Sequence, residues 1–334
     1  MRVAINGFGR IGKLVFRSFL ERKIKNVKIV AINELGSLES SLHLLKYDSS
    51  HGFLNLDIKK HKQGFKYKNE NISFFNEKNP ERLPWKKLKI DIILECSGVF
   101  TDREKAVKHI KAGAKKVIIS APAKNVDATI VQGVNDHLLN SNHQIISNGS
   151  CTTNCLAPVA MIIDKHIGIK SGFMTTVHSF TGDQRTIDQS HQDLRRARTA
   201  SAAMIPTSTG AAKALSLVLP NLKGKLDGTA IRVPTPNVSL IDFTFVSKIK
   251  TTPEKINKIM INYSKLKKLK NIFSVNQLPL VSIDFNHNMH SSIFDVTQTQ
   301  VVNNNFCRVL SWYDNEWAFS NRMIDTMLKL KKLL

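Results

Sequence analysis

The sequence contains no apolar run of about 18 residues, which excludes an ordinary membrane-spanning helix. Only four cysteines occur in 334 residues, too few for a disulfide framework, so we expect each cysteine to be catalytic, metal-bound or merely buried. The N-terminus lacks an apolar leader with a cleavage site, and we expect a cytoplasmic protein. A hydrophobic share of 42% and a charged share of 22% exclude a largely disordered chain. The length predicts about two domains.

Acidic residues are also scarce, with 26 Asp and Glu against 49 Lys and Arg, for a net charge of +23. Such a balance is typical of nucleic-acid-binding proteins. The lysines are nevertheless spread along the chain, and no basic stripe carries the aromatic residues that stack on bases. We interpret the charge as solvated surface and expect no specific nucleic-acid partner. A nucleic-acid-binding protein on a dinucleotide-binding scaffold is the alternative of another class.

The first half of the chain alternates strand and helix signals. Nearly continuous apolar strands separated by helices indicate a parallel sheet covered on both faces. Lys13–Arg22 has helical spacing, and the more polar stretch 54–83 predicts antiparallel edge strands. The expected strands are Val3–Ile5, Val27–Ile32, Ile90–Cys96, Lys116–Ser120 and Gln144–Ser147.

The second half, from Cys151, predicts a mixed sheet with helices packed on it. We therefore expect an α/β protein with a Rossmann-type domain at 1–150, an α+β catalytic domain with a largely antiparallel sheet at 151–315, and a C-terminal helix at 316–334 packing on the first domain. The expected strands are Phe173–His178, Ile231–Val233, Ser239–Ser247, Leu280–Phe285 and Phe306–Trp312, and the expected helices are Gly210–Leu219, Pro253–Leu269 and Asn321–Leu330.

A glycine pattern, G-x-G-x-x-G, follows the first strand directly, at Gly7, Gly9 and Gly12. In this position glycines permit a tight turn, backbone approach to a pyrophosphate and close packing of helix on strand. Glu34 ends the next strand, 34 − 12 = 22 residues after the last glycine, close to the roughly 20 expected of a ribose-binding acid. A carboxylate there repels a 2′-phosphate, so the pattern predicts NAD rather than NADP.

Two further strand ends carry small polar residues. Ser97-Gly98 and Ser120 end the strands at 90–96 and 116–120. Ligands sit at the carboxyl ends of strands in such sheets, which makes these residues candidate contacts on the nicotinamide side. Ordinary loop chemistry explains them equally well.

A candidate nucleophile, Cys151, opens a helix directly after a strand. The helix dipole and free N–H groups at this position are expected to lower its thiol pKa. Cys155, one turn later, is interpreted as structural or as a redox accessory. His178 ends a strand and is a candidate base, although eleven histidines leave that choice open. No second tight Cys/His pair accompanies the cysteines, so we expect no metal.

Seven segments, in order over nearly the whole chain, resemble phosphorylating glyceraldehyde-3-phosphate dehydrogenase. The resemblance is most specific at Ser-Cys-Thr-Thr-Asn-Cys and Arg-Val-Pro-Thr-Pro-Asn. The segments are Asn6–Gly12, Ser150–Asn154, Thr176–Arg185, Asp193–Arg198, Pro206–Lys213, Arg232–Val238 and Trp312–Trp317.

The resemblance implies roles for individual residues. Cys151 would add to the aldehyde of D-glyceraldehyde 3-phosphate, with His178 as base. Hydride transfer to NAD would leave a thioester, which phosphate would cleave to 1,3-bisphosphoglycerate, a reaction of glycolysis and gluconeogenesis. The implied substrate and phosphate residues are Ser150, Thr152, Thr181, Asp183, Thr209, Gly210 and Arg232. The implied cofactor residues are Asn6, Arg10, Ile11, Asn33 and Asn315, beside the glycines, Glu34, Ser97, Gly98 and Ser120. The segment from Ser179 to about Ala203 resembles a loop that lies against a neighbouring subunit, implying a homotetramer.

Some positions depart from the family pattern. Glu34 replaces the more usual Asp, and Asn33–Leu35 and Thr297–Thr299 resemble the sister enzyme erythrose-4-phosphate dehydrogenase. Thr209–Ala212 and Thr181–Asp183 resemble the triose enzyme, so the triose phosphate is the expected substrate and the sister enzyme is the alternative. Glu34, together with the retained Thr209 and Arg232, opposes an NADP-linked or non-phosphorylating aldehyde dehydrogenase.

Overall fold

The computed structural model describes residues 1–55 and 57–334 and divides the chain into two compact units. The first contains Met1–Ile130, Asp136–Gly149 and Ser320–Leu334; the second contains Val131–Asn135 and Ser150–Phe319. Within the described ranges, no helix has the length and apolar character needed to cross a membrane.

The first unit has a sheet of nine strands among the described residues, in the order β10-β11-β9-β8-β1-β2-β7-β6-β5. Every neighbouring pair from β10 to β7 is parallel, and the β5–β6–β7 edge is antiparallel, as the polar stretch predicted. The strands are β1 (Arg2–Asn6), β2 (Lys28–Asn33), β5 (Ile58–His61), β6 (Gly64–Tyr67), β7 (Glu70–Phe75), β8 (Ile92–Glu95), β9 (Lys116–Ile119), β10 (Ala128–Thr129) and β11 (Ile145–Ser147).

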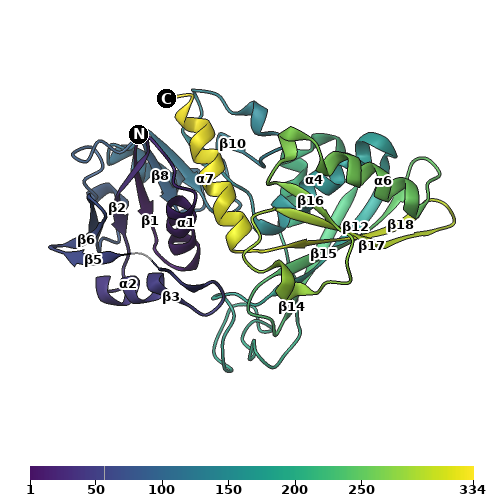
Figure 1. Ribbon diagram of the computed structural model, residues 1–334, viewed down its shortest axis with the longest axis horizontal. Coiled ribbons are helices and arrows are strands. Elements are labelled where there is room, and N and C mark those ends of the chain that lie inside the picture. Colours follow the sequence, from purple (N-terminus) through teal and green to yellow (C-terminus); the bar gives the residue numbers. More distant parts are fainter. Residues whose placement is uncertain (56) are drawn as a thin grey trace. The chain divides into compact units, whose positions relative to one another are not determined.

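Helices cover both faces of this sheet because its apolar side chains alternate in direction. Ala4 of β1 joins the cluster of Ala106 and Ala112 beside α3 (Arg103–Lys111), whereas Ile5 faces Gly12 of α1 (Arg10–Glu21). On the α1 side, the Ser18 hydroxyl donates to Asn321 Oδ1 of α7 (Trp317–Lys331) at 2.9 Å, and the two helices lie side by side (Figure 1). The unit also contains α2 (Leu38–Lys46) and the pair β3 (Tyr47–Asp48) and β4 (Gly52–Phe53).

The second unit has a seven-stranded mixed sheet, in the order β13-β14-β12-β15-β18-β17-β16 among the described residues. Only β12–β14 and β16–β17 are parallel, which confirms the largely antiparallel prediction. The strands are β12 (Ile169–Ser179), β13 (Ile205–Ser208), β14 (Leu226–Val233), β15 (Ser239–Ser247), β16 (Phe273–Asn276), β17 (Ser292–Val302) and β18 (Phe306–Tyr313).

One face of this sheet packs against α4 (Cys151–His166), α5 (Ala211–Val218) and α6 (Pro253–Ser264). On β15, the alternate residues Ile241, Phe243 and Phe245 are buried in this core, which includes Leu156 and Val159 of α4. The apolar face of β15 therefore holds the helix that begins at Cys151.

Two sequence expectations are wrong in this unit. Leu280–Phe285 is not a strand: Ser282–Phe285 forms a 3-10 turn in which the Asp284 carboxylate accepts the N–H of Val281 at 2.8 Å. The helix from Pro253 ends at Ser264, and a separate 3-10 turn follows at Lys267–Leu269. In both segments the apolar residues have the spacing expected of the predicted element. Hydrogen bonds within local turns nevertheless determine the backbone conformation. The remaining 3-10 turns are Pro80–Arg82, Asp136–Leu138 and Pro220–Leu222.

Candidate active site

The glycine loop lies between β1 and α1 in the first unit, and its three glycines have different surroundings. Gly7 has φ +86°, and a Cβ there would collide with the backbone of Ser97. A Cβ on Gly12 would collide with the carbonyl oxygen of Gly7, whereas no atom lies within 4 Å of the position a Cβ on Gly9 would take. Gly9 caps α1 without a side-chain hydrogen bond, which leaves helix N–H groups available to a pyrophosphate.

A pocket of about 490 Å³ in this unit includes six of the predicted cofactor residues: Asn6, Gly7, Gly9, Asn33, Glu34 and Ser97. The Glu34 carboxylate accepts the N–H of Phe8 through Oε2 at 2.5 Å and that of Leu35 through Oε1 at 2.8 Å. Oε2 retains a second lone pair for a ribose hydroxyl. The open cradle at Gly9 and this acceptor fit a dinucleotide.

Asn6 and Asn33 line the pocket, but their side chains bind each other rather than reaching into it. Asn33 Nδ2 donates to Asn6 Oδ1 at 2.7 Å, and Asn6 Nδ2 donates to Glu95 Oε2 at 2.6 Å. The buried Glu95 also accepts the Nε2 proton of His109, whose Nδ1 accepts the indole N–H of Trp85. Indole nitrogen can only donate, so Nδ1 of His109 accepts and its Nε2 donates to the Glu95 carboxylate. The predicted asparagines therefore join three strand ends beneath the pocket.

Five predicted cofactor residues of this unit do not line that pocket: Arg10, Ile11, Gly12, Gly98 and Ser120. Arg10 forms an ion pair with Asp48 at 3.2 Å, and Ile11 lies in the first turn of α1. Gly98 adopts φ +74°, and Ser120 lies close enough to the Cys96 thiol to lower its pKa slightly. Burial raises the pKa of that thiol, which leaves Cys96 unreactive.

In the second unit, Cys151 is the first residue of α4. Ser150 caps this helix, since its hydroxyl accepts the N–H of Thr153 at 3.0 Å. The helix then continues through Pro158 to His166. Cys155 is fully buried, with its sulfur 3.7 Å from both the Ser292 hydroxyl and the Ser311 carbonyl, and burial raises its pKa to about 12. Cys155 is therefore a structural thiol.

The structure brings Cys151 and His178 together, with Sγ 3.5 Å from Nε2. His178 lies at the end of β12, and the parallel register of β12 with β14 places Arg232 beside it. Arg232 Nη1 lies 2.6 Å from His178 Nδ1 and 3.0 Å from the Ser179 carbonyl oxygen, and that carbonyl lies 2.7 Å from the same Nδ1. Burial and the charge of Arg232 lower the pKa of His178 to about 3, so the imidazole is a neutral base.

The expected direction of the Cys151 pKa is reversed. Burial raises the pKa of the thiol, and the Arg232 charge and the N–H of Thr152 oppose that rise without overcoming it. A helix terminus alone is an insufficient guide because the partly buried Cys151 side chain also loses hydration. The resting pair is therefore a thiol beside a neutral imidazole.

Thr152 does not present its hydroxyl to a ligand. That hydroxyl bonds the Tyr313 hydroxyl at 2.9 Å, which in turn bonds Thr176 Oγ1 at 2.8 Å. Tyr313 packs edge-on against the His178 ring at a centroid distance of 5.9 Å. These three hydroxyl groups form a hydrogen-bonded chain that supports Cys151 and His178.

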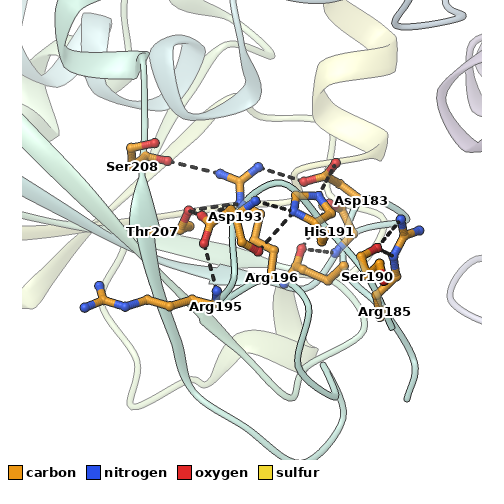
Figure 2. A network of polar contacts seen from close by, with 11 residues as sticks. Asp183, Arg185, Ser190, His191, Asp193, Arg195, Arg196, Thr207 and Ser208 are labelled. Atoms are coloured by element: carbon orange, nitrogen blue, oxygen red, sulfur yellow. Dashed lines mark hydrogen bonds and ion pairs between the residues drawn. The ribbon is translucent and has the colours of Figure 1, made fainter. Parts of the chain in front are cut away.

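Asp183 lies in the loop after β12, where a network of ion pairs holds it (Figure 2). Arg196 bonds Asp183 Oδ2 at 2.7 Å, Thr207 Oγ1 at 2.9 Å and the Ser208 carbonyl at 3.3 Å. Arg196, which the sequence analysis did not single out, therefore ties the Asp183 loop to the end of β13. Thr181 is held nearby, where its N–H donates to Gln184 Oε1 at 2.9 Å.

The other predicted residues occupy separate places in this unit. Thr209 and Gly210 precede α5, and Thr209 Oγ1 accepts the N–H of Ala211 at 3.2 Å. Neither has a hydrogen bond to Cys151, His178 or Arg232 in the described part of the chain. Asn315 follows β18 and is buried. Within residues 1–55 and 57–334, no three His, Cys, Asp or Glu side chains are grouped to hold a metal ion.

Several supporting residues escaped the sequence analysis. Glu95 ends an otherwise apolar strand, which is a usable signal that the charge is buried and partnered. His109, Trp85, Arg196 and Tyr313 gave no local signal, because their partners lie far away along the chain.

Comparisons with known proteins agree with this geometry. Residues 1–103 match the model "Glyceraldehyde 3-phosphate dehydrogenase, NAD binding domain", and residues 150–315 match "Glyceraldehyde 3-phosphate dehydrogenase, C-terminal domain". The chain is 53% identical over 333 residues to a glyceraldehyde-3-phosphate dehydrogenase of Xanthobacter flavus, covering 100% of this chain and 99% of the relative. It is 52% identical to the enzyme of Zymomonas mobilis, with 100% and 99% covered, and 49% identical to that of Cereibacter sphaeroides, also with 100% and 99% covered. The chain belongs to the glyceraldehyde-3-phosphate dehydrogenase family.

Proposed function

We propose that this protein catalyses the NAD-dependent, phosphorylating oxidation of D-glyceraldehyde 3-phosphate to 1,3-bisphosphoglycerate, the glycolytic and gluconeogenic reaction of its family. The observation that carries the proposal is the pairing of Cys151 with a neutral His178 at 3.5 Å, beside the cation Arg232. A thiol, a base and an anion-binding guanidinium are the groups that covalent catalysis on a phosphorylated aldehyde requires.

His178 takes the thiol proton as the Cys151 sulfur adds to the aldehyde carbon, and it returns that proton to the aldehyde oxygen, giving a hemithioacetal and a neutral imidazole. Removal of the hydroxyl proton by the same imidazole then assists loss of hydride from that carbon, and a thioester to Cys151 remains. Bound NAD would supply the hydride acceptor. A phosphate oxygen attacks the thioester carbon, the sulfur leaves, and the acyl phosphate is released.

These reaction steps use two anion-binding positions. Arg232, with Thr181 and Asp183, would hold the phosphate of the substrate, and Arg196 offsets the charge of the Asp183 carboxylate at 2.7 Å. Ser150, Thr209 and Gly210 would hold the attacking phosphate, with neutral hydroxyl and N–H donors. We assign Thr152 to support through Tyr313, because its hydroxyl is already bonded there at 2.9 Å.

The first unit would bind NAD at the glycine loop, with Glu34 accepting from the ribose and Asn6 and Asn33 shaping the floor of the pocket. Arg10, Ile11, Ser97, Gly98 and Ser120 remain proposed contacts around it. Asn315 in the second unit would orient the nicotinamide carboxamide. We further propose a cytoplasmic homotetramer. In support of self-association, the loop at 179–203 and the residue next to it expose large apolar side chains, namely Ile187 at 74%, Leu194 at 81% and Met204 at 75%.

The test follows NADH formation with glyceraldehyde 3-phosphate, NAD and phosphate, beside the same assay with erythrose 4-phosphate. Faster turnover of the triose that depends on phosphate is expected. Faster turnover of the tetrose, or indifference to phosphate, would assign the chain to the sister activity. Cys151→Ser should lower kcat roughly 10⁴-fold or more while NAD still binds, and Cys155→Ala is the matched control.

A further inference from the structure

The amide of Asn315 is held by two buried serine hydroxyls on one side. Ser179 Oγ, at the end of β12, and Ser239 Oγ, at the start of β15, each donate to Asn315 Oδ1 at 2.9 Å. Ser179 is 0% exposed, Ser239 is 1% and Asn315 is 5%, so water does not compete strongly for these bonds. All three residues belong to the second unit.

The protons of these hydroxyls determine which amide atom lies between them. Ser239 Oγ already accepts the backbone N–H of Ser179 at 3.0 Å, so its own proton is available to an acceptor. An amide oxygen accepts from both hydroxyls at 2.9 Å, whereas an amide NH₂ there would leave the Ser179 proton without an acceptor and the Ser239 proton with only the longer contact to Ser179 Oγ at 3.5 Å. Asn315 Oδ1 therefore lies between the serines, and Nδ2 has no hydrogen-bond partner among the described residues.

The backbone around Asn315 is fixed as well. The buried Asp314 carboxylate accepts the N–H groups of Glu316 and Trp317 at 2.9 and 2.7 Å through Oδ1. Its Oδ2 accepts from Asn237 Nδ2 at 2.9 Å and from the N–H of His287 at 2.7 Å. The main chain and the amide plane of Asn315 are thus both held, and only the NH₂ group is free to donate.

We propose that Ser179 and Ser239 are positioning residues that lock the Asn315 amide with its NH₂ group outward, so that it recognises the carbonyl oxygen of the nicotinamide carboxamide. This assignment rests on the proposed function. Ser179 also links this group to the base, because its carbonyl lies 2.7 Å from His178 Nδ1 while its hydroxyl holds Asn315. One residue thereby fixes both the general base and the cofactor-orienting amide.

The test compares the binding of NAD and of ADP-ribose, which lacks the nicotinamide, by calorimetry on the full-length protein. Ser179→Ala and Ser239→Ala should each weaken NAD binding roughly 5- to 20-fold, the range of one lost hydrogen bond to a buried group. ADP-ribose should bind within about twofold of wild type, because its proposed contacts lie in the first unit. Ser247→Ala is the matched control: it lies in the same strand at 1% exposure, but its hydroxyl donates to Ile249 O.

The outcomes separate the two proposals. Unchanged NAD affinity in both variants would overturn the positioning role alone. Equal weakening of NAD and ADP-ribose would also contradict it, since that pattern indicates general disruption. Absence of NAD binding by the wild-type protein would overturn the proposed function, and this assignment with it.

Discussion

Arg232 Nη1 lies 2.6 Å from His178 Nδ1, and the same Nδ1 lies 2.7 Å from the Ser179 carbonyl oxygen. A guanidinium can only donate and a carbonyl can only accept, so Nδ1 serves one of them at a time. When Nδ1 carries the proton and donates to Ser179, Nε2 presents its lone pair to the Cys151 sulfur. A substrate phosphate that draws Arg232 away from the ring would favour this base-competent tautomer.

The charge of Arg232 also acts on the nucleophile. It is the largest influence that lowers the Cys151 pKa against the effect of burial. Arg232→Leu should therefore move the pH midpoint of Cys151 alkylation by iodoacetamide upward. Arg195→Leu, an exposed arginine in the loop after β12, is the control and should leave the midpoint in place. A midpoint that stays put or falls in Arg232→Leu would contradict this electrostatic account.

His178 should make stability depend on pH. Its folded pKa of about 3 lies below its ordinary value of 6.5, so between these values the unfolded chain binds a proton that the folded chain does not. Stability is lost as the pH falls through this window. His178→Gln should remove that part of the acid sensitivity, measured as the difference in free energy of unfolding between pH 7 and pH 5. The same difference in free energy of unfolding in the wild-type protein and in His178→Gln would contradict this prediction.

Glu34 should determine the choice of coenzyme. Its carboxylate is tied to the glycine loop through Phe8 N–H at 2.5 Å, where it would repel a ribose 2′-phosphate. Glu34→Gln should raise the ratio of NADP to NAD affinity roughly tenfold, since it removes a like charge at short range. Glu39→Gln, in the first turn of α2, is the control with the same loss of charge. A ratio unchanged in Glu34→Gln would remove Glu34 from coenzyme selection.

The sequence was a reliable guide where chemistry is local. The strand before Gly7 and the helix after it, the helix that begins at Cys151 and the alternation of Ser239–Ser247 all depend on neighbouring residues, and the structure has each of them. The candidate pair of Cys151 and His178 was also named, although its 3.5 Å separation depends on how β12 and α4 pack.

Features that depend on interactions between residues far apart in the chain could not be predicted from the sequence. The Cys151 pKa was misjudged because burial depends on the whole unit rather than on the helix terminus. The resemblance implies cofactor roles for Asn6 and Asn33, but it does not predict that a buried Glu95, 89 residues after Asn6, accepts from the Asn6 amide. The serines that orient Asn315 lie 136 and 76 residues away from it.

The most direct test of the account is a single turnover without phosphate. Mixing the protein with NAD and glyceraldehyde 3-phosphate should give a burst of about one NADH per active site, then near arrest. Mass spectrometry should find the acyl group on the peptide that carries Cys151, and added phosphate should release it as acyl phosphate. Continuous turnover without phosphate, or a burst with no adduct on Cys151, would contradict the thioester mechanism.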